Sequence, residues 1–449
     1  MRSYFGTDGI RGLANRHPMT VELALRLGKA AALHFAHRGH APKILIGKDP
    51  RLSSYMFESA LAAGINSLGG NVLFTGPLPT AGIAYLTNTM RCDAGIVISA
   101  SHNPYFDNGI KIFGADGFKL PDATEEEIEA LLDDASLLDR ETLPERIGRS
   151  RRLDDATGRY IVFLKMLFPR ELSLDGLRIV VDCANGAAYK VAPAVLWELG
   201  AEIIPTGVEP NGLNINDGVG ALHPEHCARL VVEHDADLGL ALDGDADRVV
   251  FADRDGNVVD GDQIMAMTAL ELAAQGRLRR NTVVATVMSN LGLDLALRER
   301  GLELVRTQVG DRYVVEEMRQ GGYSFGGEQS GHLIFLDLST TGDGIIAALQ
   351  VLAAMQRARK PLGELVSVMR KLPQVLINVA VREKRPLAEL PSVQAVVDAV
   401  SAELGERGRV LVRFSGTEPK CRVMLEGPDE ASIRAQAERI VRAIREAIG

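Results

Sequence analysis

The sequence predicts an α/β fold with three similar α/β units, a smaller final unit and a central cleft between domains. Two observations lead to this prediction. Short apolar, β-branched runs alternate with helical patterns along most of the chain, which is typical of largely parallel strands joined by helices. The chain also has 449 residues, too many for one core at roughly 100–200 residues per domain.

The strand patterns come in order along the chain. Apolar runs cover residues 43–47, 71–75, 178–182 and 282–286, and a helical pattern follows each of them. A last helical pattern has apolar residues at intervals of three and four, which suits a helix packed on a sheet. These residues are Ile433, Ala437, Ile440, Val441, Ile444 and Ile448.

Three breaks interrupt this alternation. Residues 121–157 are densely charged, and Thr124 and Glu127 have the spacing of a capping box, so we interpret this segment as an exposed connection with a solvated helix. The other breaks lie near residues 255–256 and 359–373. The expected domains are therefore residues 1–150, 151–255, 256–368 and 374–449.

Composition excludes several classes of protein. The net charge of −9 argues against a nucleic-acid partner. The four cysteines are far apart, which indicates neither a disulfide framework nor a zinc ribbon. The N-terminus has no signal-peptide pattern, and no apolar run is long enough to span a membrane. We expect a cytoplasmic protein without a membrane partner.

One pattern occurs four times: a β-rich run, a polar loop that contains glycine, and a second β-rich run. The four copies cover residues 94–114, 238–253, 323–337 and 409–427. Each loop has different polar residues, so the four loops are expected to converge on one central site.

The second loop contains three carboxylates at alternate positions, Asp243, Asp245 and Asp247, directly after an apolar run. Carboxylates this close repel one another unless a divalent cation neutralises them. An EF-hand would need glycine and glutamate where this chain has Arg248 and Arg254. Mg²⁺ is favoured, because few protein ligands leave room for phosphate oxygens.

The first loop offers two candidate nucleophiles, Ser99 and Ser101, at the end of an apolar strand. The pattern differs from the G-x-S-x-G elbow of hydrolases, and spacing alone does not decide between the two serines or exclude a plain turn. Lys111 on the returning strand is a candidate for charge stabilisation or proton transfer.

The last two loops carry groups suited to a sugar phosphate. In the fourth, hydroxyls, an open glycine backbone and two guanidiniums suit a phosphate group: Arg413, Ser415, Gly416, Thr417 and Arg422. In the third, Glu328 and Ser330 can hold sugar hydroxyls, and His332 can carry a proton.

Together these loops resemble the α-D-phosphohexomutase superfamily over nearly the whole chain. The resemblance includes the opening FGTDGIRG and the segments TQVGDRYV and TTGDG. It implies that the fourth domain has a TATA-binding-protein-like α+β fold. It also implies that Ser101, rather than Ser99, is the phosphoserine, with Asp243, Asp245 and Asp247 as Mg²⁺ ligands beside it.

The remaining site residues follow from the same resemblance. Arg11, Lys111 and His332 match positions for charge stabilisation and proton transfer, and Glu328 and Ser330 match positions that hold sugar hydroxyls. Arg413, Ser415, Gly416, Thr417 and Arg422 match the distal phosphate site. The chain departs from relatives at Phe414, where they commonly have proline.

The implied activity is the interconversion of glucosamine 6-phosphate and glucosamine 1-phosphate, a step toward UDP-N-acetylglucosamine. Glucosamine 1,6-bisphosphate would be both the intermediate and the activator. The alternative is the same reaction on mannose or glucose phosphates, although Gln329 favours the amino sugar. The resemblance also implies a possible homodimer.

Overall fold

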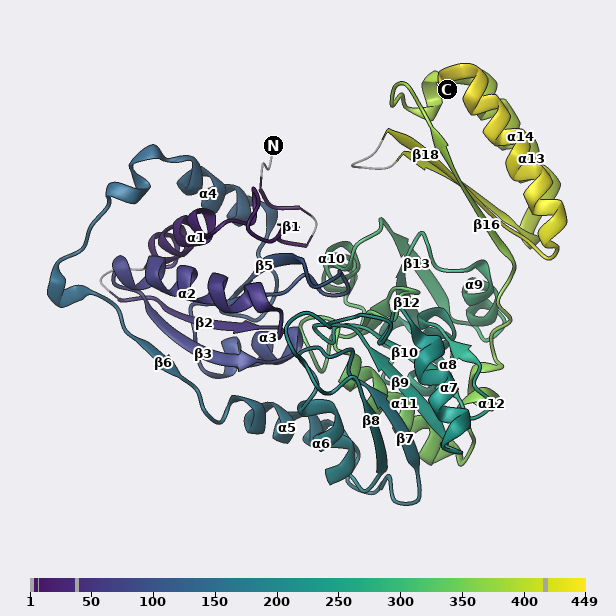
Figure 1. Cartoon of the computed structure of the whole chain (residues 1–449). Coiled ribbons are helices and arrows are strands. Elements are labelled where there is room, and N and C mark those ends of the chain that lie inside the picture. The colour runs from purple at the N-terminus through teal and green to yellow at the C-terminus, as the bar shows by residue number, and fades with distance from the viewer. Residues whose placement is uncertain (1–3, 7, 37–39, 415–418) are drawn as a thin grey trace. The chain divides into compact units, whose positions relative to one another are not determined.

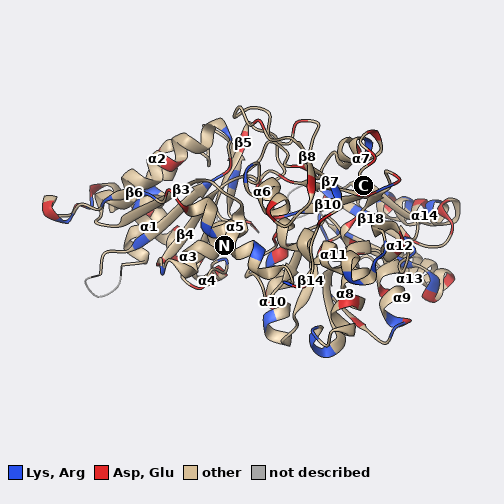
Figure 2. Cartoon of the chain, turned by 90° about the horizontal axis from the view of Figure 1, so that it is seen from below, with Lys and Arg blue, Asp and Glu red and all other residues tan. Residues whose placement is uncertain are grey.

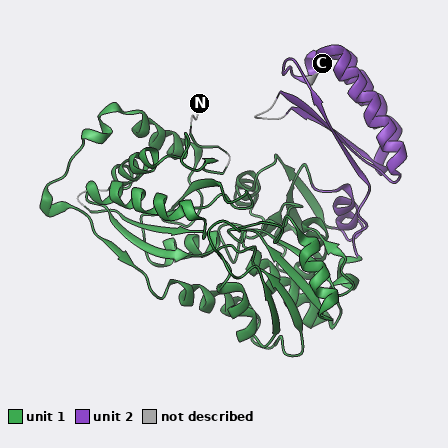
Figure 3. Cartoon of the chain, in the orientation of Figure 1, with its two compact units in different colours: residues 1–288, 302–367 green, residues 289–301, 368–449 purple. Residues whose placement is uncertain are grey.

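The computed structural model describes residues 4–6, 8–36, 40–414 and 419–449 (Figure 1). The chain forms two compact units, coloured separately in Figure 3. Unit 1 comprises Met1–Met288 and Leu302–Ser367, and unit 2 comprises Ser289–Gly301 and Val368–Gly449. Three sheets lie in unit 1 and a fourth in unit 2, so the predicted fold class of three mixed α/β sheets and a smaller sheet with helices is confirmed.

The first sheet has the strand order β1-β5-β4-β2-β3-β6. Its strands β2, β3, β4 and β6 are parallel, and β5 and β1 continue the sheet through antiparallel pairing at one side. The strands are β1 (Ile10–Leu13), β2 (Lys43–Lys48), β3 (Asn71–Pro77), β4 (Ala94–Ile98), β5 (Asp107–Gly114) and β6 (Ser150–Arg152). The associated helices are α1 (Val21–His34), α2 (Leu52–Ser67), α3 (Thr80–Thr89) and α4 (Asp122–Asp133).

The second sheet has the order β11-β10-β9-β7-β8, with an antiparallel hairpin of β9 and β10. Its strands are β7 (Arg178–Asp182), β8 (Glu202–Thr206), β9 (Leu238–Leu242), β10 (Val249–Asp253) and β11 (Val258–Val259). The helices in this part of the chain are α5 (Ala156–Leu167), α6 (Val191–Glu198) and α7 (Pro224–Glu233). Residues of β9 and β10 are buried throughout, so the loop between them begins and ends in the core.

The third sheet has the order β13-β12-β14-β15. Its strands are β12 (Thr282–Thr286), β13 (Glu303–Thr307), β14 (Phe325–Gly327) and β15 (Leu333–Phe335). The helices in this part of unit 1 are α8 (Gly261–Ala274), α10 (Asp311–Gly321), α11 (Gly344–Ala358) and α12 (Leu362–Val366).

Unit 2 contains an antiparallel sheet of order β16-β18-β17, with helices α13 and α14 packed against it. The elements are α9 (Leu291–Arg298), β16 (Gln374–Ala380), α13 (Pro391–Leu404), β17 (Arg409–Phe414), β18 (Lys420–Glu426) and α14 (Glu430–Ile448). The apolar stripe predicted for the last helix is wholly buried in the core of this unit.

The predicted capping box in the charged connection is wrong. Helix α4 begins at Asp122 after Pro121, so Thr124 lies inside the helix and does not cap it. The interpretation as a solvated helix is also wrong for one face. Glu125 and Glu129 are buried, because Glu129 accepts the N–H groups of Tyr4 and Phe5 and Glu125 binds an arginine of α10.

Each predicted β-loop-β segment is an antiparallel pair: β4 with β5, β9 with β10, β14 with β15, and β17 with β18. Acidic and basic residues are interspersed on the helices, as Figure 2 shows. Among the helices of the described residues, none combines the length and apolar character that a membrane crossing needs.

Candidate active site

Ser101 lies in the loop that connects β4 to β5, and its side chain is almost completely buried. Its hydroxyl donates a hydrogen bond to Asp243 Oδ2 at 2.5 Å, although the two residues are 142 positions apart. The first and second loops of the repeat therefore meet at this serine. The backbone of Ser101 has φ +52°, a left-handed conformation that few residues other than glycine adopt.

The other candidate serine has a different role. The hydroxyl of Ser99 donates to Asp49 Oδ2 at 2.6 Å and accepts the backbone N–H of Ser101 at 2.9 Å. The hydroxyl of Ser99 is therefore already hydrogen-bonded to Asp49 and to the Ser101 backbone, whereas the hydroxyl of Ser101 faces the three carboxylates.

The three carboxylates of Asp243, Asp245 and Asp247 come together, with one oxygen of each within 4.8 Å of the others. All three residues are buried. Asp245 Oδ1 has no hydrogen-bond partner among the described residues, which is unusual for a buried carboxylate oxygen. Hard oxygen donors in this arrangement can hold a metal ion.

The pKa of Asp243 also agrees with a metal site at these three carboxylates. Burial, followed by the charges of Asp247 and Asp245, raises the pKa of Asp243 well above its ordinary value. A divalent cation would offset both effects, because it replaces lost hydration and neutralises the neighbouring charges.

Lys111 supplies a cation next to the triad. It is buried on β5, and its Nζ lies 3.0 Å from Asp245 Oδ2, 3.5 Å from Asp247 Oδ2 and 3.1 Å from Asp8 Oδ2. Burial opposes the charged form, but the three carboxylates outweigh it and raise the pKa of Lys111. The lysine is thus held as a cation between the first and second sheets.

The charges continue as a closed ring of alternating sign. Lys119 binds Asp8 and, at 2.5 Å, Asp311 Oδ2. His332 lies 3.5 Å from both Asp311 Oδ2 and Asp247 Oδ1, and Asp247 leads back to Lys111. This ring joins residues of all three sheets of unit 1.

The histidines of the first and third loops differ in charge. Burial opposes protonation of His332, yet Asp247 and Asp311 raise its pKa to about 9. Burial, with Arg248 and Arg11 nearby, lowers the pKa of His102 to about 4. At neutral pH His332 is therefore a cation and His102 is neutral.

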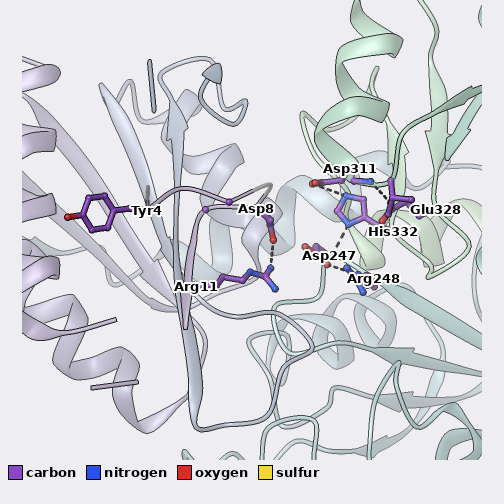
Figure 4. Close-up of a pocket in the computed structure, with 12 residues that line it drawn as sticks. Tyr4, Asp8, Arg11, Asp247, Arg248, Asp311, Glu328 and His332 are labelled. Atoms are coloured by element: carbon purple, nitrogen blue, oxygen red, sulfur yellow. Dashed lines mark hydrogen bonds and ion pairs between the residues drawn. The ribbon is translucent and has the colours of Figure 1, made fainter. Parts of the chain in front are cut away.

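A cavity of about 370 Å³ opens beside the ring. Figure 4 shows Asp8 and Arg11 facing Asp311, Glu328 and His332 across it, with Asp247 and Arg248 below. Arg11 pairs with Asp8. The backbone N–H of Gly310 donates to Glu328 at 3.2 Å, which positions that carboxylate at the cavity wall. Charged groups of both signs thus line the space.

The third loop is held against the second sheet by its backbone. Val249 N donates to Gly331 O at 3.1 Å, and Gly261 N donates to Gln329 O at 3.0 Å. Gly331 has φ +89°, and a Cβ there would lie 2.1 Å from the carbonyl oxygen of Val249, so only glycine fits. Ser330 Oγ, between these anchors, has no hydrogen-bond partner among the described residues.

The expected distal phosphate residues lie in unit 2. Arg413 on β17 stands opposite Arg422 on β18 in the antiparallel register. Burial and the nearby charge of Arg422 lower the pKa of Arg413. Two adjacent guanidiniums favour a bound anion. Ser415, Gly416 and Thr417, predicted to complete this loop, lie outside the described residues.

Sequence reasoning did not single out Asp8, Lys119 or Asp311 as site residues. Asp8 and Asp311 lie inside the segments FGTDGIRG and TQVGDRYV that carry the resemblance, so a signal was present. Lys119 had no such signal, because its two partners are 111 and 192 positions away.

Four models of one family match successive parts of the chain. They describe α/β/α domains I, II and III and the C-terminal domain of phosphoglucomutase/phosphomannomutase, and they match residues 2–138, 159–256, 260–372 and 376–443. The chain belongs to the phosphoglucomutase/phosphomannomutase family, as its resemblance to phosphohexomutases led us to expect.

Similar proteins narrow the relationship further. Phosphoglucosamine mutase of Syntrophotalea carbinolica is 60% identical over 450 residues, covering 100% of this chain and 98% of the relative. Phosphoglucosamine mutase of Anaeromyxobacter sp. strain Fw109-5 is 60% identical over 452 residues, covering 100% and 96%. These relatives agree with the glucosamine phosphate interconversion that the resemblance implied, and they confirm an isomerase class of enzyme.

Solved structures share the fold at low identity. A phosphoglucomutase/phosphomannomutase family protein from Burkholderia thailandensis has a TM-score of 0.81 at 22% identity, covering 100% of this chain and 98% of that one. N-acetylphosphoglucosamine mutase of Aspergillus fumigatus, in complex with GlcNAc-6P and magnesium, has a TM-score of 0.67 at 18% identity, covering 99% and 96%.

Proposed function

We propose that the protein interconverts glucosamine 6-phosphate and glucosamine 1-phosphate through phospho-Ser101. The 60% identity to proteins named phosphoglucosamine mutase over the whole chain supports the substrate. The observation that carries the reaction is the hydrogen bond of Ser101 to Asp243, inside a buried acidic group that Lys111 adjoins. A serine hydroxyl, a group of carboxylates suited to a metal ion and a fixed cation together support phosphoryl transfer at this site.

In the forward direction the phosphoryl group leaves Ser101 Oγ for the 1-hydroxyl of glucosamine 6-phosphate. The P–O bond to serine breaks, a P–O bond to the sugar forms, and the proton of the sugar hydroxyl passes, in net, to Ser101 Oγ, giving the 1,6-bisphosphate. The bisphosphate then turns, its 6-phosphoryl group passes to Ser101 Oγ, and the serine proton passes, in net, to the 6-oxygen of the sugar. The product is glucosamine 1-phosphate, and the phosphoenzyme is restored.

The cations around Ser101 suit this transfer. Lys111 and His332 are both charged at neutral pH, because neighbouring carboxylates raise their pKa values, to about 9 for His332. Since charge on the transferred group is stabilised by preorganised cations, these two residues and Arg11 would stabilise it without rearranging. His332 already holds its proton, so it suits donation to a leaving oxygen rather than acceptance from an attacking one.

We infer that Asp243, Asp245 and Asp247 hold Mg²⁺ together with an oxygen on Ser101. The unpartnered oxygen of Asp245 fits such an ion. When bound, the ion supplies positive charge that neutralises phosphate oxygens.

The sugar and the distal phosphate would be held elsewhere. Glu328 and Ser330 are proposed to bind the sugar hydroxyls, which fits the carboxylate at the cavity wall and the unpartnered hydroxyl. Arg413 and Arg422, with Ser415, Gly416 and Thr417, are proposed to bind the phosphate that is not reacting. Glucosamine 1,6-bisphosphate is proposed as the activator. The cytoplasmic location and the homodimer stay predictions.

A substrate panel tests the proposal. Glucosamine, glucose and mannose phosphates are assayed with Mg²⁺ and the matching bisphosphate, after mass spectrometry has measured the fraction of phospho-Ser101. We expect the highest kcat/KM with the glucosamine phosphates. A preference for mannose or glucose phosphates would reject the amino sugar in favour of the alternative substrates. Turnover of none of them would reject the activity.

A further inference from the structure

A wholly buried arginine lies behind the loop that carries Ser101. Arg51 has no exposed surface, and its guanidinium donates to four backbone carbonyls of this loop. Nη2 donates to Ser101 O and Asn103 O, both at 2.8 Å, while Nη1 donates to Pro104 O and, at 3.2 Å, to Asp107 O. One side chain thus fixes the course of the loop from Ser101 to the start of β5.

Asp49 completes this arrangement on the opposite side of the guanidinium. Its Oδ2 accepts Arg51 Nε at 2.7 Å and the hydroxyl of Ser99 at 2.6 Å. Ser99 in turn accepts the N–H of Ser101. Both polar groups of the Ser101 backbone are therefore hydrogen-bonded to a network that begins at the Asp49–Arg51 pair.

A third residue reaches the same carbonyls from a different part of the chain. Asn216, in the segment between β8 and α7, donates through Nδ2 to Ser101 O at 2.9 Å and to Asn103 O at 3.1 Å. A Cβ on Gly244, inside the acidic loop, would lie 2.5 Å from Ser101 O and 2.9 Å from Asn216 Nδ2. The acidic loop thus passes directly over these hydrogen bonds.

The conformation of Ser101 explains what the network is for. Its φ of +52° is unfavourable for a residue with a Cβ, and such a conformation persists only when its surroundings impose it. With that conformation the hydroxyl reaches Asp243. A relaxed loop would move the hydroxyl away from the acidic group.

We propose that Arg51 and Asn216 are positioning residues for phosphoryl transfer, acting through the backbone of Ser101. This inference rests on the proposed function of Ser101. Neither residue is among those that line the cavity beside Glu328 and His332. Their loss should therefore lower kcat much more than it raises KM for the sugar phosphate, because a small misplacement of the reacting atom slows transfer without removing substrate contacts.

Two variants and a control test this. Arg51→Met removes the guanidinium at similar length, and Asn216→Ala removes the second donor while leaving the Asp49–Arg51 pair intact. The control is Lys29→Met, because Lys29 is also a buried cation that donates to backbone carbonyls, of Leu138 at 2.8 Å and Arg140 at 3.1 Å. Each protein is assayed at a measured level of phospho-Ser101, and amide hydrogen exchange of residues 99–109 is followed by mass spectrometry.

We expect kcat to fall on the order of 10- to 100-fold in Arg51→Met and by a smaller factor in Asn216→Ala, with KM changed less than about two-fold. Exchange of residues 99–109 should accelerate in both variants and stay unchanged in Lys29→Met. An unchanged kcat, or an equal fall in Lys29→Met, would overturn the proposal. If Arg51→Met does not fold, the proposal is tested by kcat and by the exchange of residues 99–109 in Asn216→Ala.

The exchange measurement also separates this inference from the proposed function. A wild-type protein that turns over no phosphosugar would reject the function, whereas unchanged exchange in Arg51→Met and Asn216→Ala would reject the role of these residues in holding the loop.

Discussion

Lys111 and Asp245 lie 3.0 Å apart, Nζ to Oδ2, and they join the first sheet to the acidic loop of the second. Thr80 Oγ1 donates to the same carboxylate oxygen at 2.7 Å, which leaves Asp245 Oδ1 without a partner. One oxygen of Asp245 therefore has a structural role, and the other is available to a cation.

Asp245→Asn should weaken Mg²⁺ binding by an order of magnitude or more and lower the rate, because the acidic group loses one of its three anionic ligands. Calorimetric titration with Mg²⁺ measures the affinity, and activity is assayed over a range of Mg²⁺ concentrations. Asp255→Asn removes the same charge from an exposed position after β10 and serves as the control. Equal Mg²⁺ titrations for the two variants would place the metal elsewhere.

Ser101→Ala should abolish turnover and leave the melting temperature almost unchanged, because only the hydroxyl is removed and the backbone bonds from Arg51 and Asn216 persist. Ser99 cannot substitute, since its hydroxyl is engaged with Asp49. Peptide mapping after incubation with the bisphosphate should find phosphate on Ser101 in the wild type and on neither serine in the variant. Phosphorylation of Ser99 would contradict the assignment.

Arg422→Ala should weaken binding of both the 6-phosphate and the 1-phosphate by about ten- to a hundred-fold, the equivalent of roughly 1.5–3 kcal/mol for a charge-assisted hydrogen bond. Under the proposed function both orientations of the sugar use the distal site, so forward and reverse kcat/KM should fall together. Bisphosphate released per turnover should increase.

Arg439→Ala is the matched control for this prediction, because Arg439 belongs to the same unit and pairs with Glu403 on the surface. A variant Arg422→Ala that behaves like this control would remove Arg422 from the phosphate site.

The raised pKa of Asp343 predicts that the stability of the folded state depends on pH. Burial raises its pKa to about 6, although it accepts hydrogen bonds from Tyr160 and from two N–H groups of α11. A raised pKa means that the folded state binds the proton of Asp343 more tightly than the unfolded state does. The stabilisation of the folded state by this proton is fully present below about pH 4 and is lost as the pH rises through 6. Two pKa units correspond to about 3 kcal/mol.

Asp343→Asn keeps the acceptor for the two N–H groups and removes the titration. The melting temperature of the wild type relative to this variant should therefore fall between pH 4 and pH 7. A difference that is constant over this range would show that Asp343 does not titrate there.

The sequence predicted those parts of the site that are contiguous in the chain. The acidic loop and the serine loop each follow a strand and carry their chemistry within a few residues, so residue type and spacing were sufficient. Arg51 and Lys119 were missed, because the carbonyls that Arg51 binds and the carboxylates that Lys119 binds are 50 or more positions away. A charged residue in a sequence gives no sign of being buried when its partner is this distant.

The interpretation of residues 121–157 as an exposed connection with a solvated helix was wrong at Glu125 for the same reason. Glu125 looks like part of a solvated helix until Arg312, 187 positions later, binds it. The dense charge and the spacing of Thr124 and Glu127 indicated a helix in this segment, but they could not distinguish a carboxylate that meets water from one that meets an arginine.

The ring of alternating charges has a consequence for synthesis on the ribosome. The early members of the ring leave the ribosome well before the late members. The early members are Asp8, Lys111 and Lys119, and the late members are Asp247, Asp311 and His332. Until the third sheet has been translated, Lys119 lacks its partner Asp311, and burying a charge without its partner is costly. Closure of the ring is therefore a late step in the maturation of the nascent chain. A polypeptide released before residue 332 would contain Ser101 and lack the closed ring.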